Sequence, residues 1–403
     1  MKNVSENPKQ TATFRFLLPF FTANALVYGL LAVYYSFVPK YLCDIAEKSD
    51  GEIGIILSVG PFVGIVSMIF FGIASDRAKY KNNVLIFIIS AAAVVFYMAR
   101  LSASLVYLIF VFGLFMFFLS PFGGLLDVVL LEYAVSAGIK YGPVRFFGSL
   151  CFGLIALFLT FALSFFGDYI DVRIIFPVFA VMALFAAVST KKLPPVKGHA
   201  RGKKNISYKT FFKDKTCVTL FIFIFAMQFA FGCYYDFTQN YLEKTLNLPP
   251  WVWGLTVFLT ITGELVFFVK FDYFFRRFTI KNIVIFCVFM QFVRCLGFAL
   301  LPFGAGVLCI SLITGSFGTI MMYAAIYYLN LTLAKEMMAF GQTLLYAVSY
   351  YIPRGLAGVL GGFLVEKFGF TTLMLICAGL NLTLFLASGF MPFTNPDKKT
   401  DLC

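Results

Sequence analysis

The chain has 403 residues, of which 61% are hydrophobic and only 13% charged, with a mean hydropathy of +0.90 and a net charge of +13. One soluble core cannot bury this much apolar surface, so the composition excludes an ordinary soluble protein and predicts an all-α membrane protein. The basic residues are scattered over short loops, which argues against a nucleic-acid-binding domain.

Twelve apolar runs are long enough, at about 20 residues, to cross a bilayer core of about 30 Å as helices. In chain order, they cover 15–38, 53–75, 83–99, 104–135, 140–166, 169–190, 216–240, 252–274, 281–301, 304–334, 338–365 and 369–391. Most Lys and Arg residues then fall on the side that holds both chain ends. Because such residues accumulate in cytoplasmic loops, we expect a multi-pass protein of the cytoplasmic membrane with both termini in the cytoplasm.

A basic segment with Pro194, Pro195 and Gly198 separates the sixth predicted helix from the seventh. We therefore predict an N-terminal bundle at 1–190, a cytoplasmic linker at 191–215 and a C-terminal bundle at 216–403. A faint repeat about 200 residues apart supports two related six-helix bundles.

Six charged residues interrupt the apolar runs. They are Asp127, Arg145, Asp236, Glu264, Arg294 and Arg354. Each costs about 2.5 to 3.5 kcal/mol at the centre of a membrane helix on insertion scales, so we expect each to have a partner or water and to serve a function.

Asp127 and Arg145 each lie nine residues from Ser136, near the turn of a predicted helical hairpin, and so reach similar depths. We expect them to bind solute, because the planar fork of Arg suits hydroxyls or a carboxylate. An ion pair that only joins the two helices is the alternative. Phe152, two turns beyond Arg145, could stack on a flat solute or pack as an ordinary apolar residue.

In the second half, Glu264, Arg294 and Arg354 fall near mid-membrane by helical rise, and Asp236 lies nearer the end of its helix. A neighbouring Arg favours the charged carboxylate, so a small movement of the Arg can release or recapture a proton. We predict that these four residues couple proton and solute. Direct solute contact by Glu264 and purely structural pairing are the alternatives.

The stretch Gly72-Ile-Ala-Ser-Asp76-Arg77-Ala-Lys-Tyr-Lys81 resembles the loop signature of the major facilitator superfamily, Gly-x-x-x-Asp-Arg/Lys-x-Gly-Arg/Lys-Arg/Lys. Ala78 replaces its second Gly, and Tyr80 replaces one basic residue. The resemblance implies the major facilitator fold, with two pseudo-symmetric six-helix bundles around a cavity of alternating access. It also implies gating roles for Gly72, Asp76 and Arg77. A loop that only sets the topology is the alternative.

Nearly the whole chain resembles lactose permease and its oligosaccharide/proton symporter relatives. Asp127 and Arg145 have the 18-residue spacing of the Glu and Arg that hold the sugar in those permeases. The pairs Gly263-Glu264 and Val293-Arg294, with Cys233-Tyr-Tyr-Asp236, match further permease motifs in order. The resemblance implies that Phe152 occupies the position of the Trp that stacks on the sugar.

Two positions depart from the permease pattern. Tyr350 stands where the permeases have the Lys that pairs with the helix 7 acid, and Arg354, one turn later on the same face, is the expected substitute as partner of Asp236. Ser311, Thr314 and Phe317 occupy the positions of the permease Lys, His and proton-carrying Glu. Either the proton moves to Glu264 or Asp236, or the protein is a uniporter or uses another ion.

The sequence thus predicts a secondary active transporter and not an enzyme, with proton-coupled symport of a sugar or glycoside as the leading hypothesis. Symport of a nucleoside or aromatic acid, drug/proton antiport and a receptor without flux are the alternatives. The expected partners are the solute, a proton and the lipid bilayer. We expect a monomer without cofactor or metal.

Overall fold

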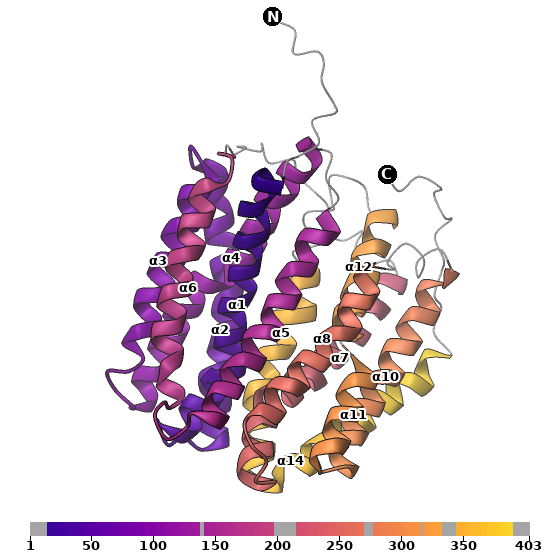
Figure 1. The fold of residues 1–403 in the computed structure, drawn as a ribbon. Helices are drawn as coiled ribbons and strands as arrows, with labels where there is room; N and C mark the ends of the chain where they lie inside the picture. The colour runs from indigo at the N-terminus through magenta and orange to yellow at the C-terminus, as the bar shows by residue number, and fades with distance from the viewer. Residues whose placement is uncertain are drawn as a thin grey trace, which may run out of the picture.

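In this computed structural model, all regular elements of the described residues are helices, and none is a strand (Figure 1). The described residues are 14–137, 141–196, 215–269, 277–315, 317–332 and 344–389. The first half contains α1 (Phe14–Asp44), α2 (Asp50–Arg77), α3 (Lys81–Met98), α4 (Leu105–Ala137), α5 (Tyr141–Phe165) and α6 (Ile175–Lys192). The second half contains α7 (Lys215–Asn240), α8 (Trp251–Val269), α10 (Ile280–Leu300), α11 (Gly304–Thr314), α12 (Phe317–Thr332) and α14 (Ile352–Ser388). Short π-helical turns, Tyr241–Thr245 and Ala347–Tyr351, follow α7 and precede α14.

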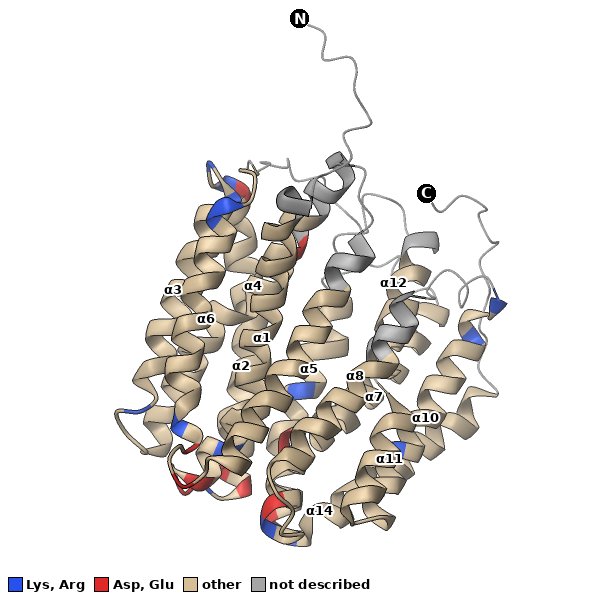
Figure 2. Cartoon of the chain, in the orientation of Figure 1, with Lys and Arg blue, Asp and Glu red and all other residues tan. Residues whose placement is uncertain are grey.

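Most of the apolar residues belong to helices that are long enough to span a membrane. Within the described ranges, nine helices are long and apolar enough to cross a membrane, and three shorter apolar helices accompany them. Large apolar side chains such as Val106, Phe110 and Phe158 are exposed on the helix surfaces, as expected where lipid is the solvent. The ribbon of Figure 2 is coloured as charged mainly at the two ends of the helices, with few such positions in the middle. The prediction of an all-α membrane protein is confirmed.

Two glycines with positive φ mark breaks in the helices of the second half. Gly315, with φ of 43°, follows α11 and separates it from α12, so the predicted helix 304–334 consists of two shorter helices. Gly369, with φ of 80°, bends α14 at the first residue of the span predicted at 369–391, so the break between this span and the one predicted at 338–365 is confirmed. Glycine has no Cβ and adopts this left-handed conformation at little cost.

Capping residues decide where individual helices begin. The Ser49 side chain accepts a hydrogen bond from the Glu52 backbone N–H, and the Glu52 carboxylate accepts one from the Ser49 N–H. This reciprocal cap satisfies two backbone donors that a helix start leaves without partners. It explains why α2 begins at Asp50, earlier than the apolar run at 53 indicates.

Helix α1 contacts α7, and two more extensive helix contacts join the halves of the chain: α2 with α14, and α5 with α8. Both depend on glycine. A Cβ at Gly54 would lie 2.1 Å from the carbonyl oxygen of Gly358, and a Cβ at Gly254 would lie 2.8 Å from that of Ala156. The small residues let these backbones approach closely.

Charged residues also join the two halves at one end of the helices. We call the end where α1 finishes the Asp44 side, and the end where α2 finishes the Asp76 side. Lys40 forms ion pairs with Asp44, at 2.7 Å, and with Glu243, and Lys244 pairs with Asp44 at 3.1 Å. These four residues, which we call the Asp44 latch, connect α1 to the π-helical turn after α7. They hold the halves together on this side.

Candidate functional site

A cavity of about 220 Å³ lies between the two halves of the chain. Residues of α1 and α5 form one wall, and residues of α7, α8 and the start of α14 form the other. Its lining consists of Tyr28, Leu31, Tyr35, Ser149, Phe152, Phe231, Tyr234, Tyr235, Val257, Thr260, Ile261, Tyr350 and Arg354. We call it the central cavity.

Aromatic rings dominate the central cavity, and five of its seven rings are tyrosines. Such rings stack on a flat or ring-shaped ligand, while the hydroxyl groups of the tyrosines hydrogen-bond to it. Arg354 adds a guanidinium group with several donors. The chemistry of the lining therefore suits a small ring-shaped solute with polar groups.

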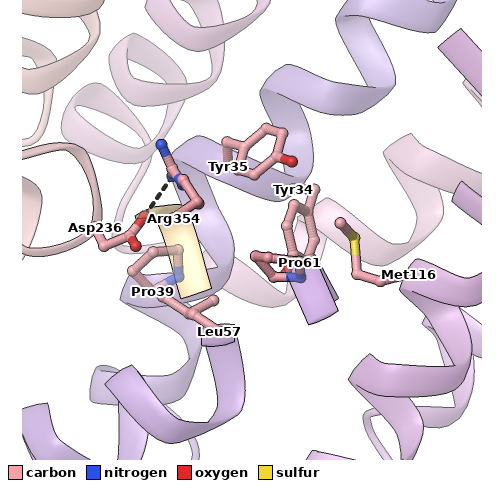
Figure 3. Close-up of a pocket in the computed structure, with 8 residues that line it drawn as sticks. All are labelled: Tyr34, Tyr35, Pro39, Leu57, Pro61, Met116, Asp236 and Arg354. Carbon is pink, nitrogen blue, oxygen red and sulfur yellow. Dashed lines mark hydrogen bonds and ion pairs between the residues drawn. The ribbon is translucent and has the colours of Figure 1, made fainter. Parts of the chain in front are cut away.

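A buried ion pair lies at the edge of the central cavity (Figure 3). Arg354 Nη2, on α14, donates to Asp236 Oδ1, on α7, and their side chains are only 8% and 5% exposed. The Arg354 guanidinium also lies 5.0 Å from the Tyr35 ring centroid and 5.3 Å from that of Tyr235. Arg354 is therefore the partner of Asp236, as the sequence predicted.

The ion pair separates the central cavity from a second, smaller one. Arg354 and Tyr35 line both cavities, and Asp236 lines only the smaller, which has a volume of about 10 Å³. Figure 3 shows its other lining residues, Tyr34, Pro39, Leu57, Pro61 and Met116. The pair thus forms part of the barrier on one side of the central cavity.

Hydrogen bonds across the two halves reinforce this barrier. The Tyr350 hydroxyl donates to the Tyr35 hydroxyl at 2.7 Å, and the Ser36 and Tyr235 hydroxyls lie 3.0 Å apart. In each case α1 contacts an element of the second half. Any movement that separates the halves here has to break both bonds.

Arg294 occupies a different environment from Arg354. Its side chain, on α10, is 1% exposed, and Nε donates to Thr314 Oγ1 at 3.0 Å. Its guanidinium lies 5.7 Å from the Phe231 ring centroid and 5.2 Å from that of Tyr234, two rings that line the central cavity. Nη1 and Nη2 have no hydrogen-bond partner among the described residues. The four-residue network predicted for the second half is therefore not seen as one cluster in the described contacts.

The other predicted site residues are only partly covered by the structure. Phe152, on α5, lines the central cavity, and Asp127, on α4, is half-buried. The side chains of Arg145 and Glu264 lie outside the described residues, so the pairing of Arg145 with Asp127 and the role of Glu264 stay predictions.

The predicted gating motif lies at the end of α2. Asp76 and Arg77 are exposed on the Asp76 side, and a Cβ added at Gly72 would meet open space. This end of the helix is opposite to the Asp44 latch. The gating role itself stays a prediction.

The sequence indicated no site role for the tyrosines of the central cavity, and Tyr350 was noted only at the position of a permease Lys. Three of the adjacent Tyr-Tyr pairs of the sequence, at 34–35, 234–235 and 350–351, contribute to the two cavities or to the barrier between them. Two adjacent tyrosines within an apolar run could have indicated these positions, because a buried Tyr needs a hydrogen-bond partner and a Phe does not.

Comparisons with known proteins agree with this architecture. A family model described as the MFS_1 like family matches residues 23–376. Maltose permease of Geobacillus stearothermophilus is 30% identical over 181 residues, which are 45% of this chain and 43% of that protein. The uncharacterized transporter YwbF of Bacillus subtilis (strain 168) is 23% identical over 230 residues, 56% of each chain. The chain thus spans about half the length of these curated relatives.

Solved structures match over a longer range. The chain superposes on a mutant of the nucleoside transporter NupG with a TM-score of 0.80 and 18% identity, covering 93% of this chain and 99% of that one. A bacterial homolog of the human lysosomal transporter Spinster, in an inward-facing and occupied conformation, gives a TM-score of 0.67 and 13% identity, with 96% and 98% covered. At these identities the likeness concerns the fold.

Proposed function

This chain belongs to the MFS_1 like family and is a membrane transporter of the major facilitator type, and on that premise we propose that it carries a small polar solute together with a proton by alternating access. The observation that carries the proposal is the central cavity between the two halves, with the buried Asp236–Arg354 pair at its edge. A charged pair at such a place is costly in a membrane and is usually retained for function.

We propose that the fold consists of two six-helix bundles, 1–190 and 216–403, joined by the linker 191–215. If α11 and α12 form one crossing, and if α14 with its preceding turn forms two around Gly369, the chain crosses the membrane twelve times. The bias of Lys and Arg in the loops supports cytoplasmic termini in the cytoplasmic membrane. Under this orientation, the Asp44 latch closes the outer side, and the described conformation faces inward.

A sugar or glycoside is the proposed solute. The tyrosines and Arg354 offer both ring faces and hydrogen-bonding groups, and Phe152 lies at the wall where stacking was predicted. Asp127 and Arg145 extend the proposed site in the first half. The maltose permease alignment supports a sugar, although it covers less than half of either chain.

A nucleoside or aromatic acid is the second candidate solute. The observation that favours it is the aromatic lining, because seven rings around one cavity also suit a flat heteroaromatic base.

We propose that the Asp236–Arg354 pair couples proton and solute movement. Protonation of Asp236 would remove the attraction that holds Arg354, and Arg354 also contacts Tyr35 across the two halves. The barrier beside the central cavity would then be easier to open. Glu264 stays a proposed second proton carrier, since Phe317 stands at the acidic position of the permeases.

On the Asp76 side, we propose that Gly72, Asp76 and Arg77 form the gate that closes when the Asp44 side opens.

The protein would act as a monomer, because each chain carries a complete cavity between its own halves.

Solute exchange in proteoliposomes tests the transport function and the solute class together. Vesicles loaded with an unlabelled sugar, nucleoside or aromatic acid receive a trace of the same labelled solute outside. We expect a labelled sugar or glycoside to exchange, with nucleosides and aromatic acids as the next classes. A protein that binds a solute in dialysis but exchanges none would be a receptor, and our transport proposal would be wrong.

A further inference from the structure

Arg294 carries a buried positive charge for which the described part of the chain provides no counter-charge. Nε has one partner, the hydroxyl of Thr314, but Nη1 and Nη2 have none among the described residues. An unpaired charge in a dry interior is strongly unfavourable, so a guanidinium at this depth normally contacts an anion. The ring faces of Phe231 and Tyr234 compensate only part of that cost.

Where the resembling permeases have ionisable side chains, this chain has neutral ones. Thr314 accepts the hydrogen bond of Arg294 and donates its own proton to the Ile310 carbonyl oxygen at 2.6 Å. Phe317, the residue at the permeases' acidic position, packs against Phe286. Neither residue can neutralise a guanidinium.

The guanidinium lies one ring away from the central cavity. Phe231 and Tyr234 contact Arg294 with their rings and also line the cavity. Phe231 is only partly buried and lines the cavity, so part of its ring borders the open space there. A rotation of this ring would give a ligand in the cavity access to Nη1 and Nη2.

We propose that Arg294 binds a small monoanion, which is most simply a carboxylate group of the transported solute. A carboxylate matches the planar fork of Arg with two parallel hydrogen bonds. The inference rests on the proposed transport function and narrows its solute to an acidic ring compound, such as a uronic acid or an aromatic acid. A chloride ion also carries a single negative charge, so it is the alternative anion that could bind Arg294 at this place.

Anion binding can be measured without transport, so that a failure here is distinguishable from a failure of the transport proposal. The purified protein in nanodiscs is kept in a zwitterionic buffer free of small anions, and Tm is followed while galacturonate, galactose, benzoate or chloride is added. Parent protein is compared with Arg294→Met and with the control Arg100→Met, an exposed arginine that contacts Tyr97 near the end of α3.

We expect the carboxylates to raise the Tm of the parent and of Arg100→Met, and not that of Arg294→Met. Galactose should act at least tenfold more weakly than galacturonate. In the absence of anions, Arg294→Met should have a higher Tm than the parent, because it removes an uncompensated buried charge. If chloride acts at concentrations as low as the carboxylates do, the anion is inorganic and the solute is neutral.

Two results would overturn the proposal. One is an equal response of parent and Arg294→Met to every anion, including no response at all. The other is a lower Tm of Arg294→Met without anions, since that would reveal a counter-charge within the chain. Should Arg294→Met fail to fold, Arg294→Lys takes its place as the test variant, because it keeps the charge but loses the planar fork. Its affinity for carboxylates must then fall at least several-fold, while its response to chloride persists.

Discussion

Asp236 and Arg354 can both stay charged inside the membrane because each compensates the other. Removing one partner from a buried pair leaves an unpaired charge and costs about 3 to 5 kcal/mol, whereas removing both costs much less. We expect Asp236→Asn and Arg354→Gln each to lower the stability by this amount, and the double variant Asp236→Asn/Arg354→Gln to recover most of it.

Thermal unfolding of the purified variants, analysed as a double-mutant cycle, measures this coupling. The matched control is the pair Asp171 and Arg173, whose charged groups lie 3.5 Å apart and are about half exposed. Such surface pairs contribute about 0 to 1 kcal/mol, so neutralising this one should change the stability little. Additive losses at Asp236 and Arg354 would contradict the importance of the buried pair.

Phe152 is expected to contribute to solute affinity through its ring. Stacked aromatic contacts and the area they bury are worth about 1 to 3 kcal/mol, so Phe152→Ala should weaken binding by about 5-fold to 150-fold in equilibrium dialysis. Phe158→Ala, on the same helix but 63% exposed to the lipid side, is the control and should leave affinity unchanged. Equal affinities for both variants would remove Phe152 from the site.

At the scale of residues, the sequence predicted charges better than it predicted tyrosines. Asp236 and Arg354 stand out because an apolar run tolerates a charge only with a partner. The resemblance to the permeases indicated which Arg that partner is, since Arg354 lies one turn after the position of their Lys. Tyr35 did not stand out among the many aromatic residues of the chain, and Tyr350 stood out only as the replacement of a permease Lys, with no role of its own. Their role depends on a contact between α1 and the π-helical turn before α14, which sequence periodicity does not reveal.

At the scale of helices, the approach of α2 to α14 decides whether the Asp44 side can close. Gly54→Ala would place a methyl group 2.1 Å from the Gly358 carbonyl oxygen. Because this is a backbone atom, the two helices have to separate. We expect the variant to shift the population toward conformations that are open on the Asp44 side.

Spin labels at Ser104 and Phe303 report on this movement, since they lie at the Asp44 side in the first and second halves. Their distance distribution should move to longer values in Gly54→Ala. Gly379→Ala, in α14 but facing open space, should match the parent. A distribution for Gly54→Ala that is identical to that of the parent would show that α2 and α14 do not control closure.

The prediction of helices from apolar runs succeeded for type and approximate position, and it failed at internal breaks. The runs at 53–75 and 104–135 correspond to Asp50–Arg77 and Leu105–Ala137. The run at 304–334 gave no sign that Gly315 would interrupt it, because glycines are frequent within these helices. Only the backbone conformation, with its positive φ, distinguishes this glycine from those that serve close packing.

At the scale of the whole molecule, the Asp44 latch should bias the protein toward the described conformation. Glu243 pairs with Lys40 and accepts a hydrogen bond from Gln239 at 3.0 Å. We expect Glu243→Gln to increase the fraction open on the Asp44 side, as measured with the same spin labels. Raising the ionic strength in the parent should act in the same direction, because salt screens these partly exposed charges.

Asp168→Asn supplies the control for the latch, because Asp168 is exposed in the loop that follows α5. Its distance distribution should match that of the parent. If Glu243→Gln also matches the parent, the latch contributes nothing to closure, and the glycine contacts between α2 and α14 are sufficient.

The central claim is that this transporter couples solute movement to a proton through the Asp236–Arg354 pair. Accumulation of labelled solute in proteoliposomes with an imposed inward proton gradient tests it most directly, with Asp236→Asn compared with the parent. We predict accumulation above the external concentration by the parent, its loss on adding a protonophore, and only equilibration by Asp236→Asn. Accumulation by the parent that does not depend on the proton gradient, or undiminished accumulation by Asp236→Asn, would contradict the account.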